Sequence, residues 1–181
     1  MSRLEPVDPS TATGKAKDLL DAVKAKLGIV PNMTKVMASS PVVLESYLAF
    51  SGALAGGLLD AKTREALALL TAQQNGCDYC LSAHTAIGKM VGLNDEQIVA
   101  SREGNGLNPK ATAALTLAER VLATKGEISE ADLKTAKAAG LSEGEIAEVI
   151  AHVALNVFTN YFNVATDVDI DFPKVSHQKL A

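Results

Sequence analysis

The segment between Asp60 and Asn75 constrains the fold of this chain more than any other, because its apolar side chains are not confined to one face. Leucine and alanine fill almost every position of its middle part, at Ala66, Leu67, Ala68, Leu69, Leu70 and Ala72. A helix that is apolar on every side must be buried. Asp60 is a suitable N-cap for this helix, and Asn75-Gly76 supplies the left-handed residue that ends it. We therefore expect a buried helix with other helices packed around it.

Helical spacing and helix boundary signals recur along the rest of the chain, and no strand of any length competes with them. We expect further helices over residues 16–27, just after Pro31, from Pro41 to about Ala55, from Cys77 to Gly92, after Asn94, over residues 114–122, after Ser129, and from Ser142 through Val157. Aromatic residues make up only 4% of the 181 residues, whereas strands prefer β-branched and aromatic side chains. The predicted fold class is all-α, in one domain over residues 1–181 with irregular arms at about 1–12 and 167–181.

The charge balance argues against several classes of partner. The net charge is −4, and no segment gathers Lys or Arg, so we expect neither nucleic acid nor an anionic membrane as a partner. Residues 1–8 lack the apolar core of a signal peptide, and the most apolar run, about residues 48–59, is interrupted by Ser51 and three glycines. We expect a soluble, cytoplasmic protein. In that reducing compartment a lone pair of cysteines is more often catalytic, redox-active or metal-binding than structural.

Both cysteines of the chain lie close together, as Cys77 and Cys80, and His84 follows the second after four residues. Cysteine reacts as the thiolate, and the start of a helix stabilises an anion, so we expect lowered pKa values for both thiols. Residues four apart are neighbours on one helix face, so His84 can serve Cys80 more easily than Cys77. The same face is expected to form one stripe of six residues, Cys80, Ala83, His84, Ile87, Met90 and Val91.

Glu65 is the residue that we expect to partner His84. The short turn at Asn75-Gly76 makes an antiparallel helix pair, in which Glu65, about ten residues before the turn, lies nearly level with His84, about eight after it. A carboxylate on a buried helix also needs a partner. The sequence therefore predicts a relay in which Glu65 orients His84 and His84 moves a proton to or from Cys80. Cys77 would resolve the oxidised Cys80 as a disulfide, through a sulfenic acid.

Other uses of the same residues stay open. Two thiolates, His84 and a fourth group such as His152 could form a tetrahedral zinc site, although Cys77 and His84 lie two helical turns apart. The acid–base groups Glu65, His84 and His152 could instead serve a decarboxylase or an isomerase. A purely structural helical module is the third alternative.

Several further polar residues are candidates for a pocket. His152, Asn156 and Asn160 recur every four residues on a helix that is otherwise apolar, a pattern that suits either a substrate pocket or hydrogen bonds within the core. Tyr79 lies beside Cys80, where its hydroxyl group either reaches the site or packs elsewhere. His177, near the end of the chain, carries no functional signal.

Glu65, Cys77, Cys80 and His84 together have the spacing Glu-x11-Cys-x2-Cys-x3-His. This resembles the core signature of the alkylhydroperoxidase D-like (AhpD-like) group of the carboxymuconolactone decarboxylase superfamily. The flanking sequences resemble its peroxidase-related subgroup: Asn75-Gly76, Asp78-Tyr79, Asn160-Tyr161-Phe162-Asn163 and Asp171-Phe172-Pro173. The likeness covers roughly residues 31–173.

The resemblance implies an all-helical homo-oligomer, a trimer or a hexamer, that uses no organic or metal cofactor. It implies that Cys80 is the peroxidatic cysteine and Cys77 the resolving one, with Glu65 and His84 as the proton relay. The substrate would be a small hydroperoxide, and the reductant a protein or a small thiol. Tyr79 stands where the peroxidase pattern has a histidine. Decarboxylase members of the superfamily generally lack the cysteine pair.

Overall fold

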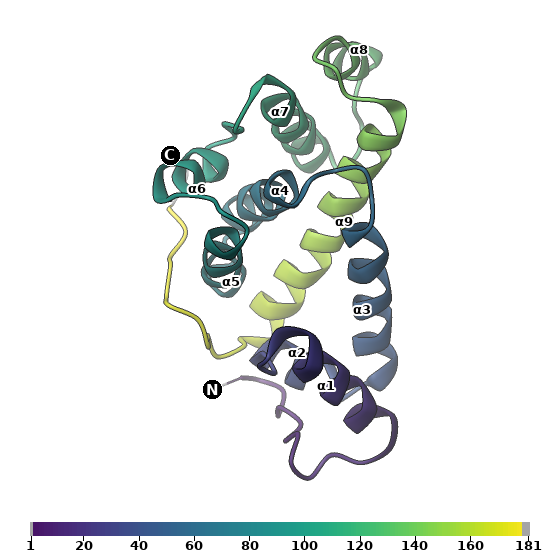
Figure 1. Ribbon diagram of the computed structural model, residues 1–181, viewed down its shortest axis with the longest axis vertical. Helices are drawn as coiled ribbons and strands as arrows, with labels where there is room; N and C mark the ends of the chain where they lie inside the picture. Colours follow the sequence, from purple (N-terminus) through teal and green to yellow (C-terminus); the bar gives the residue numbers. More distant parts are fainter. Residues whose placement is uncertain (1, 179–181) are drawn as a thin grey trace.

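The computed structural model describes residues 2–178, which contain nine α-helices and no strand (Figure 1). The helices are α1 (Gly14–Leu27), α2 (Asn32–Met37), α3 (Pro41–Ala55), α4 (Ala61–Gln74), α5 (Asp78–Met90), α6 (Asp95–Arg102), α7 (Pro109–Thr124), α8 (Glu130–Ala138) and α9 (Glu143–Thr166). The predicted all-α class is confirmed. The predicted arms correspond to residues 2–13 and 167–178, and residues 1 and 179–181 lie outside the described part of the chain.

Most helix boundaries follow from local capping. The Asp60 carboxylate accepts a hydrogen bond from the Thr63 backbone N–H at the start of α4. Ser129 and Ser142 form the two predicted capping boxes at the starts of α8 and α9. One boundary differs, because α7 begins at Pro109, in a stretch expected to be loop. The Asn108 side chain caps that first turn, and a proline suits the first helical position.

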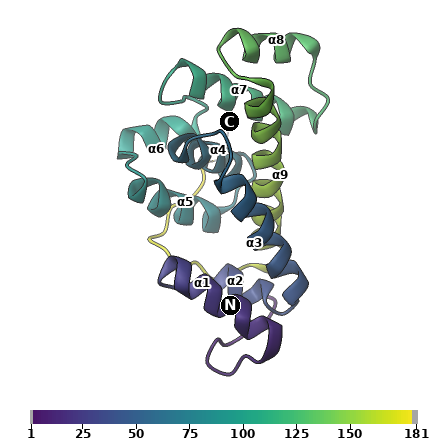
Figure 2. The same ribbon diagram turned by 45° about the vertical axis from the view of Figure 1, so that its right-hand side comes forward.

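Helix α4 lies at the centre of the molecule, as predicted. It packs against α5, α6, α7 and α9, and Leu67, Leu69 and Leu70 are fully buried. Figures 1 and 2 show it enclosed by these neighbours, with α9 as the longest of them. The buried apolar residues form two clusters, and α4 contributes to both: Leu69 and Ala72 belong to one, Ala66, Leu67 and Leu70 to the other.

Helix α9 connects the two ends of the molecule. It runs from α7 and α8 at one end to α1 and α2 at the other, beside α3 (Figures 1 and 2). Near its start, the Glu148 carboxylate accepts hydrogen bonds from the backbone N–H groups of Leu58 (2.7 Å) and Leu59 (2.9 Å). This carboxylate ties the connection between α3 and α4 to α9. A Cβ atom at Gly57 would lie 2.6 Å from the Glu148 carboxylate, so a larger residue there would displace that carboxylate.

One expectation about a buried face is wrong. Met90 was predicted to continue the stripe of Cys80 and His84, but it is 84% exposed, because α5 ends there and points its last residue to solvent. On α3, Leu44 is buried and Tyr47 and Leu48 pack against the same core cluster, whereas Val42 is 71% exposed.

The C-terminal segment, residues 167–178, runs along α5 towards α6 and packs on the body of the molecule (Figure 1). Val168 is buried, and the ring of Phe172 meets Tyr79 edge to face at 5.8 Å. The Ser82 hydroxyl accepts a hydrogen bond from the Val175 N–H (2.9 Å), and the Arg102 guanidinium donates one to the Ser176 carbonyl (3.0 Å). The predicted extended arm is therefore held by α5 and α6.

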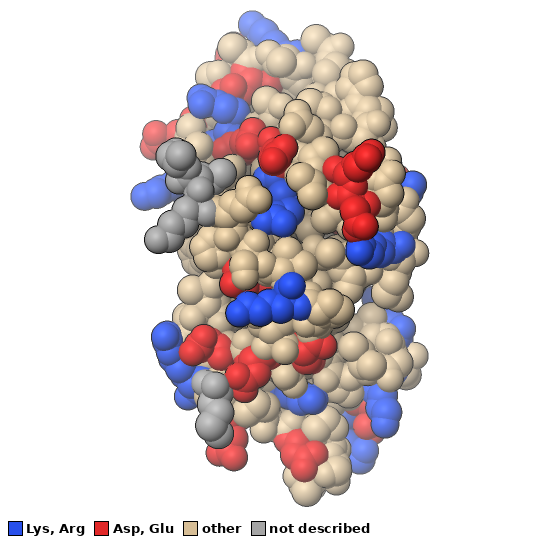
Figure 3. Space-filling view, turned by 90° about the vertical axis from the view of Figure 1, so that its left-hand side faces the viewer, with Lys and Arg blue, Asp and Glu red and all other residues tan. Residues whose placement is uncertain are grey.

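The surface carries charges of both signs. On the face that bears the C-terminal segment, Lys and Arg alternate with Asp and Glu, and neither sign dominates (Figure 3). Within residues 2–178, no helix is both long enough and apolar enough to cross a membrane.

Candidate active site

A tight turn between α4 and α5 places the candidate residues. Gly76 adopts φ 64°, which suits glycine, and the Cys77 N–H donates back to the Ala72 carbonyl (3.0 Å). Cys77 is the N-cap of α5, and its sulfur accepts a hydrogen bond from the Cys80 N–H at 3.3 Å. The turn makes α4 and α5 antiparallel neighbours, as the sequence predicts.

Glu65 and His84 form an ion pair across these two helices. The distance from Glu65 Oε2 to His84 Nδ1 is 2.8 Å, and the side chains are 16% and 22% exposed. Burial alone would favour the neutral imidazole, but the charge and the hydrogen bond of Glu65 outweigh it and raise the pKa of His84. The predicted pairing of Glu65 with His84 is therefore present, and it favours the protonated form of the ring.

The two cysteines are free thiols with their sulfur atoms 2.8 Å apart. Both are buried, and burial opposes ionisation of Cys80. The hydrogen bond from Cys77, the charge of His84 and the amide groups of Asn163 and Asn160 act in the opposite direction, and together they lower the pKa of Cys80 to about 7. Cys80 is thus the thiol that ionises near neutral pH.

The expectation of a lowered pKa for both thiols is wrong for Cys77. Its hydrogen bond to the Cys80 sulfur holds the proton on Cys77, and burial and the charge of Cys80 add to this, so the pKa of Cys77 is raised. The helix N-terminus lies beside both thiols, but two thiolates cannot form in contact with each other. One thiolate is stabilised at the expense of the other.

Two asparagines of α9 complete the surroundings of Cys80. Asn163 donates from Nδ2 to the Cys80 sulfur at 3.2 Å, and the Oδ1 atom of Asn160 accepts from Asn75 Nδ2 at 2.9 Å. Among the described residues, Asn160 Nδ2 and Asn163 Oδ1 are buried without a hydrogen-bond partner. Sequence reasoning did not single out Asn163 as a site residue. The polar stripe His152-Asn156-Asn160 could have indicated it, because Asn163 lies one further turn along the same helix.

Tyr79 directs its hydroxyl group away from the thiols. The Tyr79 oxygen accepts a hydrogen bond from the Met33 N–H (3.1 Å) and donates to Asp171 Oδ1 (2.8 Å). Burial raises the pKa of Tyr79 well above its usual range. Of the two roles left open for this residue, packing is the one observed, and it joins α5 to the C-terminal segment.

His152 and Asn156 are both buried in α9, and they do not form a metal centre with the cysteines. Asn156 Nδ2 donates to the His152 carbonyl (2.8 Å). His152 Nε2 has no partner among the described residues, and burial, with the charge of Arg64, lowers the pKa of His152. Within residues 2–178, no three side chains of His, Cys, Asp and Glu are grouped so that they could hold a metal ion. The four residues of the zinc alternative are therefore not assembled.

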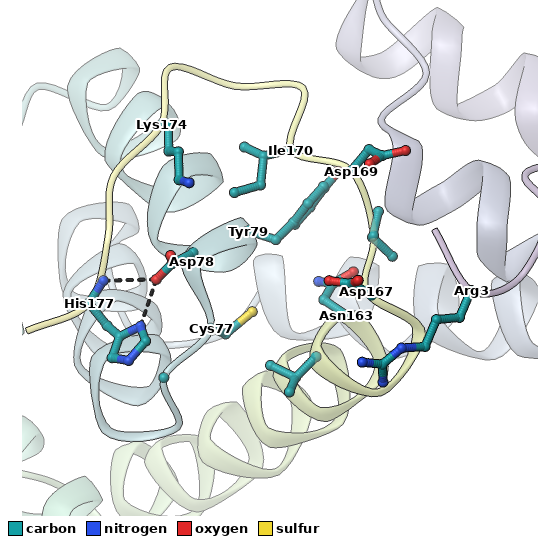
Figure 4. Close-up of a pocket in the computed structure, with 13 residues that line it drawn as sticks. Arg3, Cys77, Asp78, Tyr79, Asn163, Asp167, Asp169, Ile170, Lys174 and His177 are labelled. Carbon is teal, nitrogen blue, oxygen red and sulfur yellow. Dashed lines mark hydrogen bonds and ion pairs between the residues drawn. The ribbon is translucent and has the colours of Figure 1, made fainter. Parts of the chain in front are cut away.

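His177 has a defined place beside the site, which sequence reasoning missed. Its Nδ1 atom lies 2.7 Å from Asp78 Oδ1, and its backbone N–H donates to the same oxygen at 2.8 Å. The two residues are 99 positions apart, so no local pattern could reveal the contact. They border a pocket of about 490 Å³ that Cys77, Tyr79 and Asn163 also line (Figure 4).

The described residues thus combine an all-helical fold with a buried dithiol, a Cys80 thiol of lowered pKa and a Glu–His pair. Residues 41–120 match the carboxymuconolactone decarboxylase family. An uncharacterized protein from Haemophilus influenzae is 49% identical over 45 residues, which are 24% of this chain and 40% of that protein. The aligned part is thus less than half the length of that relative.

Solved structures share the whole fold. An uncharacterized peroxidase-related protein from Ralstonia eutropha, described as an alkylhydroperoxidase AhpD core, has a TM-score of 0.85 at 22% identity over 94% of this chain and 92% of its own. A peroxidase-related protein from Silicibacter has a TM-score of 0.77 at 23% identity, over 92% and 87%. The debrominase Bmp8, in complex with 2,3,4-tribromopyrrole, has a TM-score of 0.76 at 19% identity, over 93% and 91%.

These comparisons confirm the resemblance that the sequence suggested. The chain is AhpD-like in fold, and its residues 41–120 match the carboxymuconolactone decarboxylase family.

Proposed function

We propose that this protein is an enzyme that reduces hydroperoxides with the Cys77–Cys80 pair, which cycles between dithiol and disulfide, while Glu65 and His84 relay the protons. The observation that carries the proposal is the environment of Cys80. Its pKa is lowered to about 7, although burial opposes this, and the His84 that stabilises its charge is held by Glu65 at 2.8 Å. A thiolate, a proton donor and a second thiol are what the reaction needs.

In the oxidative step the Cys80 thiolate attacks one oxygen of the peroxide, and the O–O bond breaks. The sulfur becomes a sulfenic acid. The other oxygen leaves as an alkoxide, which takes a proton from His84 and departs as an alcohol. Burial favours the neutral ring, but Glu65 raises the pKa of His84, so the ring holds that proton near neutral pH.

In the resolving step the Cys77 sulfur attacks the sulfenic sulfur of Cys80, and the S–O bond breaks. The thiol proton of Cys77 leaves with the hydroxyl group as water. The two sulfur atoms start only 2.8 Å apart, and a disulfide bond is about 2 Å long, so little movement is required. A protein or small thiol then returns the disulfide to the dithiol, and a reducing compartment such as the cytoplasm would supply it.

The proposal is tested by treating the reduced protein with tert-butyl hydroperoxide and analysing the trapped thiols by mass spectrometry. We expect both thiols to disappear as one Cys77–Cys80 disulfide. Cys80→Ser should abolish peroxide consumption, whereas Cys77→Ser should leave a sulfenic acid on Cys80 that a dimedone probe captures.

If both thiols stay reduced in the presence of the hydroperoxide, the proposal is wrong. Glu65, His84 and His152 would then remain as acid–base groups for the alternative, a decarboxylase or an isomerase without a cofactor. That reaction would not change the oxidation state of either cysteine, so thiol counting separates the two classes of enzyme.

Reductive debromination is a second candidate, because the pair that would reduce a peroxide can also deliver two electrons to a carbon–bromine bond. In that reaction the dithiol becomes a disulfide, and an aryl bromide and two thiols give the arene, bromide and a proton. His84 would protonate the carbon. Incubating the reduced protein with 2,3,4-tribromopyrrole, the ligand of the structurally similar debrominase, and measuring released bromide tests it.

A further inference from the structure

The pocket beside the cysteine pair is lined by only one of the two cysteines. It encloses about 490 Å³, and Cys77 lines it, whereas Cys80 is not among the described residues that do. Figure 4 shows the sulfur of Cys77 directed across the pocket, towards Asn163. The volume is that of a site for a small molecule rather than for the face of a folded protein. A small reductant in this pocket would lie beside Cys77, which is 1% exposed, against 3% for Cys80.

The pKa values of the two cysteines also favour attack at the Cys77 sulfur. A thiolate that attacks a disulfide forms a bond to one sulfur and expels the other, and the expelled thiol leaves faster when its pKa is low. Attack on Cys77 expels Cys80, whose thiolate is stabilised by His84 and by Asn163 at 3.2 Å. Attack on Cys80 would expel Cys77, whose thiolate is disfavoured. The position of Cys77 in the pocket lining and the stability of the Cys80 leaving group thus favour the same direction of attack.

A proton acceptor lies at the edge of the pocket. His177 is fixed to Asp78 through both its ring and its backbone N–H, so the ring has one orientation. Its Nε2 atom faces the turn, only 3.5 Å from where a Cβ atom of Gly76 would be. Burial opposes ionisation of Asp78, but the hydrogen bonds from His177 outweigh it and lower the pKa of Asp78. Asp78 thus stays charged, with its carboxylate 2.7 Å from the His177 ring.

The other charged groups around His177 come from two further elements. Arg102 of α6 donates to the Ser176 carbonyl, and Lys174 of the C-terminal segment lines the pocket. Neither makes an ion pair with His177 among the described residues.

We propose that this pocket binds a small thiol, which attacks the Cys77 sulfur of the disulfide and gives its proton to His177, directly or through one water. The Cys77–Cys80 bond breaks, a mixed disulfide forms on Cys77, and Cys80 leaves as a thiolate. A second small thiol then attacks the mixed disulfide, which yields the oxidised small molecule and the free thiol of Cys77. Two small thiols thus supply the two electrons that reduce the pair. This inference rests on the proposed function, because the pair must cycle through a disulfide.

The first test identifies the attacked sulfur. The protein is oxidised with diamide, so that no peroxide chemistry is needed, and is mixed with 2-mercaptoethanol. The reaction is stopped early with N-ethylmaleimide, and peptide fragmentation locates the adducts. We expect mercaptoethanol on Cys77 and maleimide on Cys80. The reverse pattern, or an equal mixture, would overturn the proposal.

The second test concerns His177. The reductant here is free cysteine, whose thiol is only a few per cent ionised at about pH 7, so a base that removes its proton can accelerate attack by at most about 30-fold. We expect His177→Gln to slow the reduction by about 10- to 30-fold at about pH 7. The difference should nearly vanish at about pH 9.5, where the small thiol is already ionised. An equal loss at both pH values would mean that His177 only holds the segment in place, and would refute its role as base.

Arg102→Gln is the matched control, because it removes another contact of the same segment without touching the His177–Asp78 pair. It should leave the pH dependence unchanged. If it reproduces the loss seen in His177→Gln, the effect comes from anchoring of the segment and the proposal fails. Since diamide replaces the peroxide, failure of the proposed peroxidase activity would show only in the separate assay with tert-butyl hydroperoxide.

Discussion

At the scale of single residues, the site gives two chemically identical thiols different acidities and different roles. Cys77 and Cys80 share a helix start and a contact of 2.8 Å, yet their pKa values move in opposite directions. The sulfur–sulfur contact is one cause of these opposite shifts. The Cys77 thiol keeps its proton and donates a hydrogen bond to the Cys80 sulfur, which stabilises the Cys80 thiolate. The charge of His84 and the amide of Asn163 reach only Cys80. The chemistry follows from three elements, α4, α5 and α9, that meet at one sulfur atom.

Alkylation with iodoacetamide should report this division directly. Because only the thiolate reacts, the rate at Cys80 should rise with pH through a midpoint of about 7. Cys77 should stay unreactive over the same range, since its pKa is raised. The measurement is the initial rate against pH in the reduced protein, with Cys80→Ser as the control that removes the fast phase. A midpoint near that of an ordinary thiol would contradict the prediction.

Asn163→Leu should move that midpoint to higher pH. The substitution keeps the approximate size of the side chain but removes the N–H donor that lies 3.2 Å from the Cys80 sulfur. A thiolate that loses a hydrogen bond is less stable relative to the thiol, so its pKa rises. The same alkylation assay measures the change, and Asn105→Leu, in an exposed loop, is the matched control. An unchanged midpoint would mean that Asn163 is not a determinant of the Cys80 pKa.

Glu65→Gln should slow peroxide reduction by about 10²-fold at neutral pH. This is the lower end of the range of rate effects typical of general acid–base catalysis. Burial already favours the neutral ring of His84, and without the Glu65 charge nothing on α4 offsets it, so the pKa of His84 falls. The ring then lacks both the proton for the leaving oxygen and the charge that stabilises Cys80. Stopped-flow consumption of hydroperoxide measures the rate, and Glu96→Gln, exposed on α6, is the control. A rate within twofold of the parent would exclude the relay.

The pairing of Glu65 with His84 could be predicted, whereas that of Asp78 with His177 could not. The first pair is separated by a single tight turn, and the geometry of two antiparallel helices follows from where the turn lies. The second pair depends on the path of the C-terminal segment along α5, which no local pattern encodes. The opposite pKa shifts of the thiols were missed for a related reason, because the sulfur–sulfur contact and the α9 amides are tertiary contacts.

At the scale of whole elements, capping residues set most of the helix boundaries, and the sequence predicts them well. Gly28 takes φ 75° after α1, and Asp60 caps α4. The burial of helix faces was harder to predict. Helix α3 is apolar in composition but mostly half-buried or exposed, although it contacts α1, α2 and α9. Apolar composition by itself does not tell an interior face from an exterior one.

Glu148→Ala should destabilise the protein by about 1 kcal/mol, because the part-buried Leu59 N–H loses its partner, whereas the exposed Leu58 N–H can bond to water instead. The substitution removes the carboxylate that accepts hydrogen bonds from Leu58 and Leu59, and so releases the connection between α3 and α4 from α9. Urea denaturation followed by circular dichroism measures the change in the free energy of unfolding. Glu148→Gln keeps one acceptor and should cost less, and Glu127→Ala in an exposed loop should cost almost nothing. Equal stability of all three variants would contradict the proposed role of the Glu148 carboxylate.

At the scale of the whole molecule, α3 and α9 present an exposed apolar face that suggests self-association. It includes Val42, Phe50, Ile150, Phe158 and Tyr161. The two helices lie side by side in both views of the ribbon (Figures 1 and 2). Clusters of this kind on a surface usually mark a contact with another molecule. We propose that this face contacts other copies of the chain in a homo-oligomer, a trimer or a hexamer.

Light scattering coupled to size-exclusion chromatography should therefore give a mass several times that of the chain. Phe158→Asp should weaken the association by roughly 10- to 100-fold, since a buried aromatic side chain contributes about 1.5–3 kcal/mol. Val99→Asp, on an exposed position of α6, is the matched control and should leave the mass unchanged. A monomeric parent protein would refute the proposed assembly.

The central position of α4 has a consequence for how the molecule loses its structure. Its residues belong to both apolar clusters, Leu69 and Ala72 to one and Leu67 and Leu70 to the other. If either cluster opened while α4 stayed in place, leucine side chains of α4 would be exposed to water, which is unfavourable. Unfolding of α4 would therefore open both clusters at once. The helix that carries Glu65 is thus among the last parts of the chain to open locally, and the ion pair at the thiol is built on the least fluctuating part of the protein.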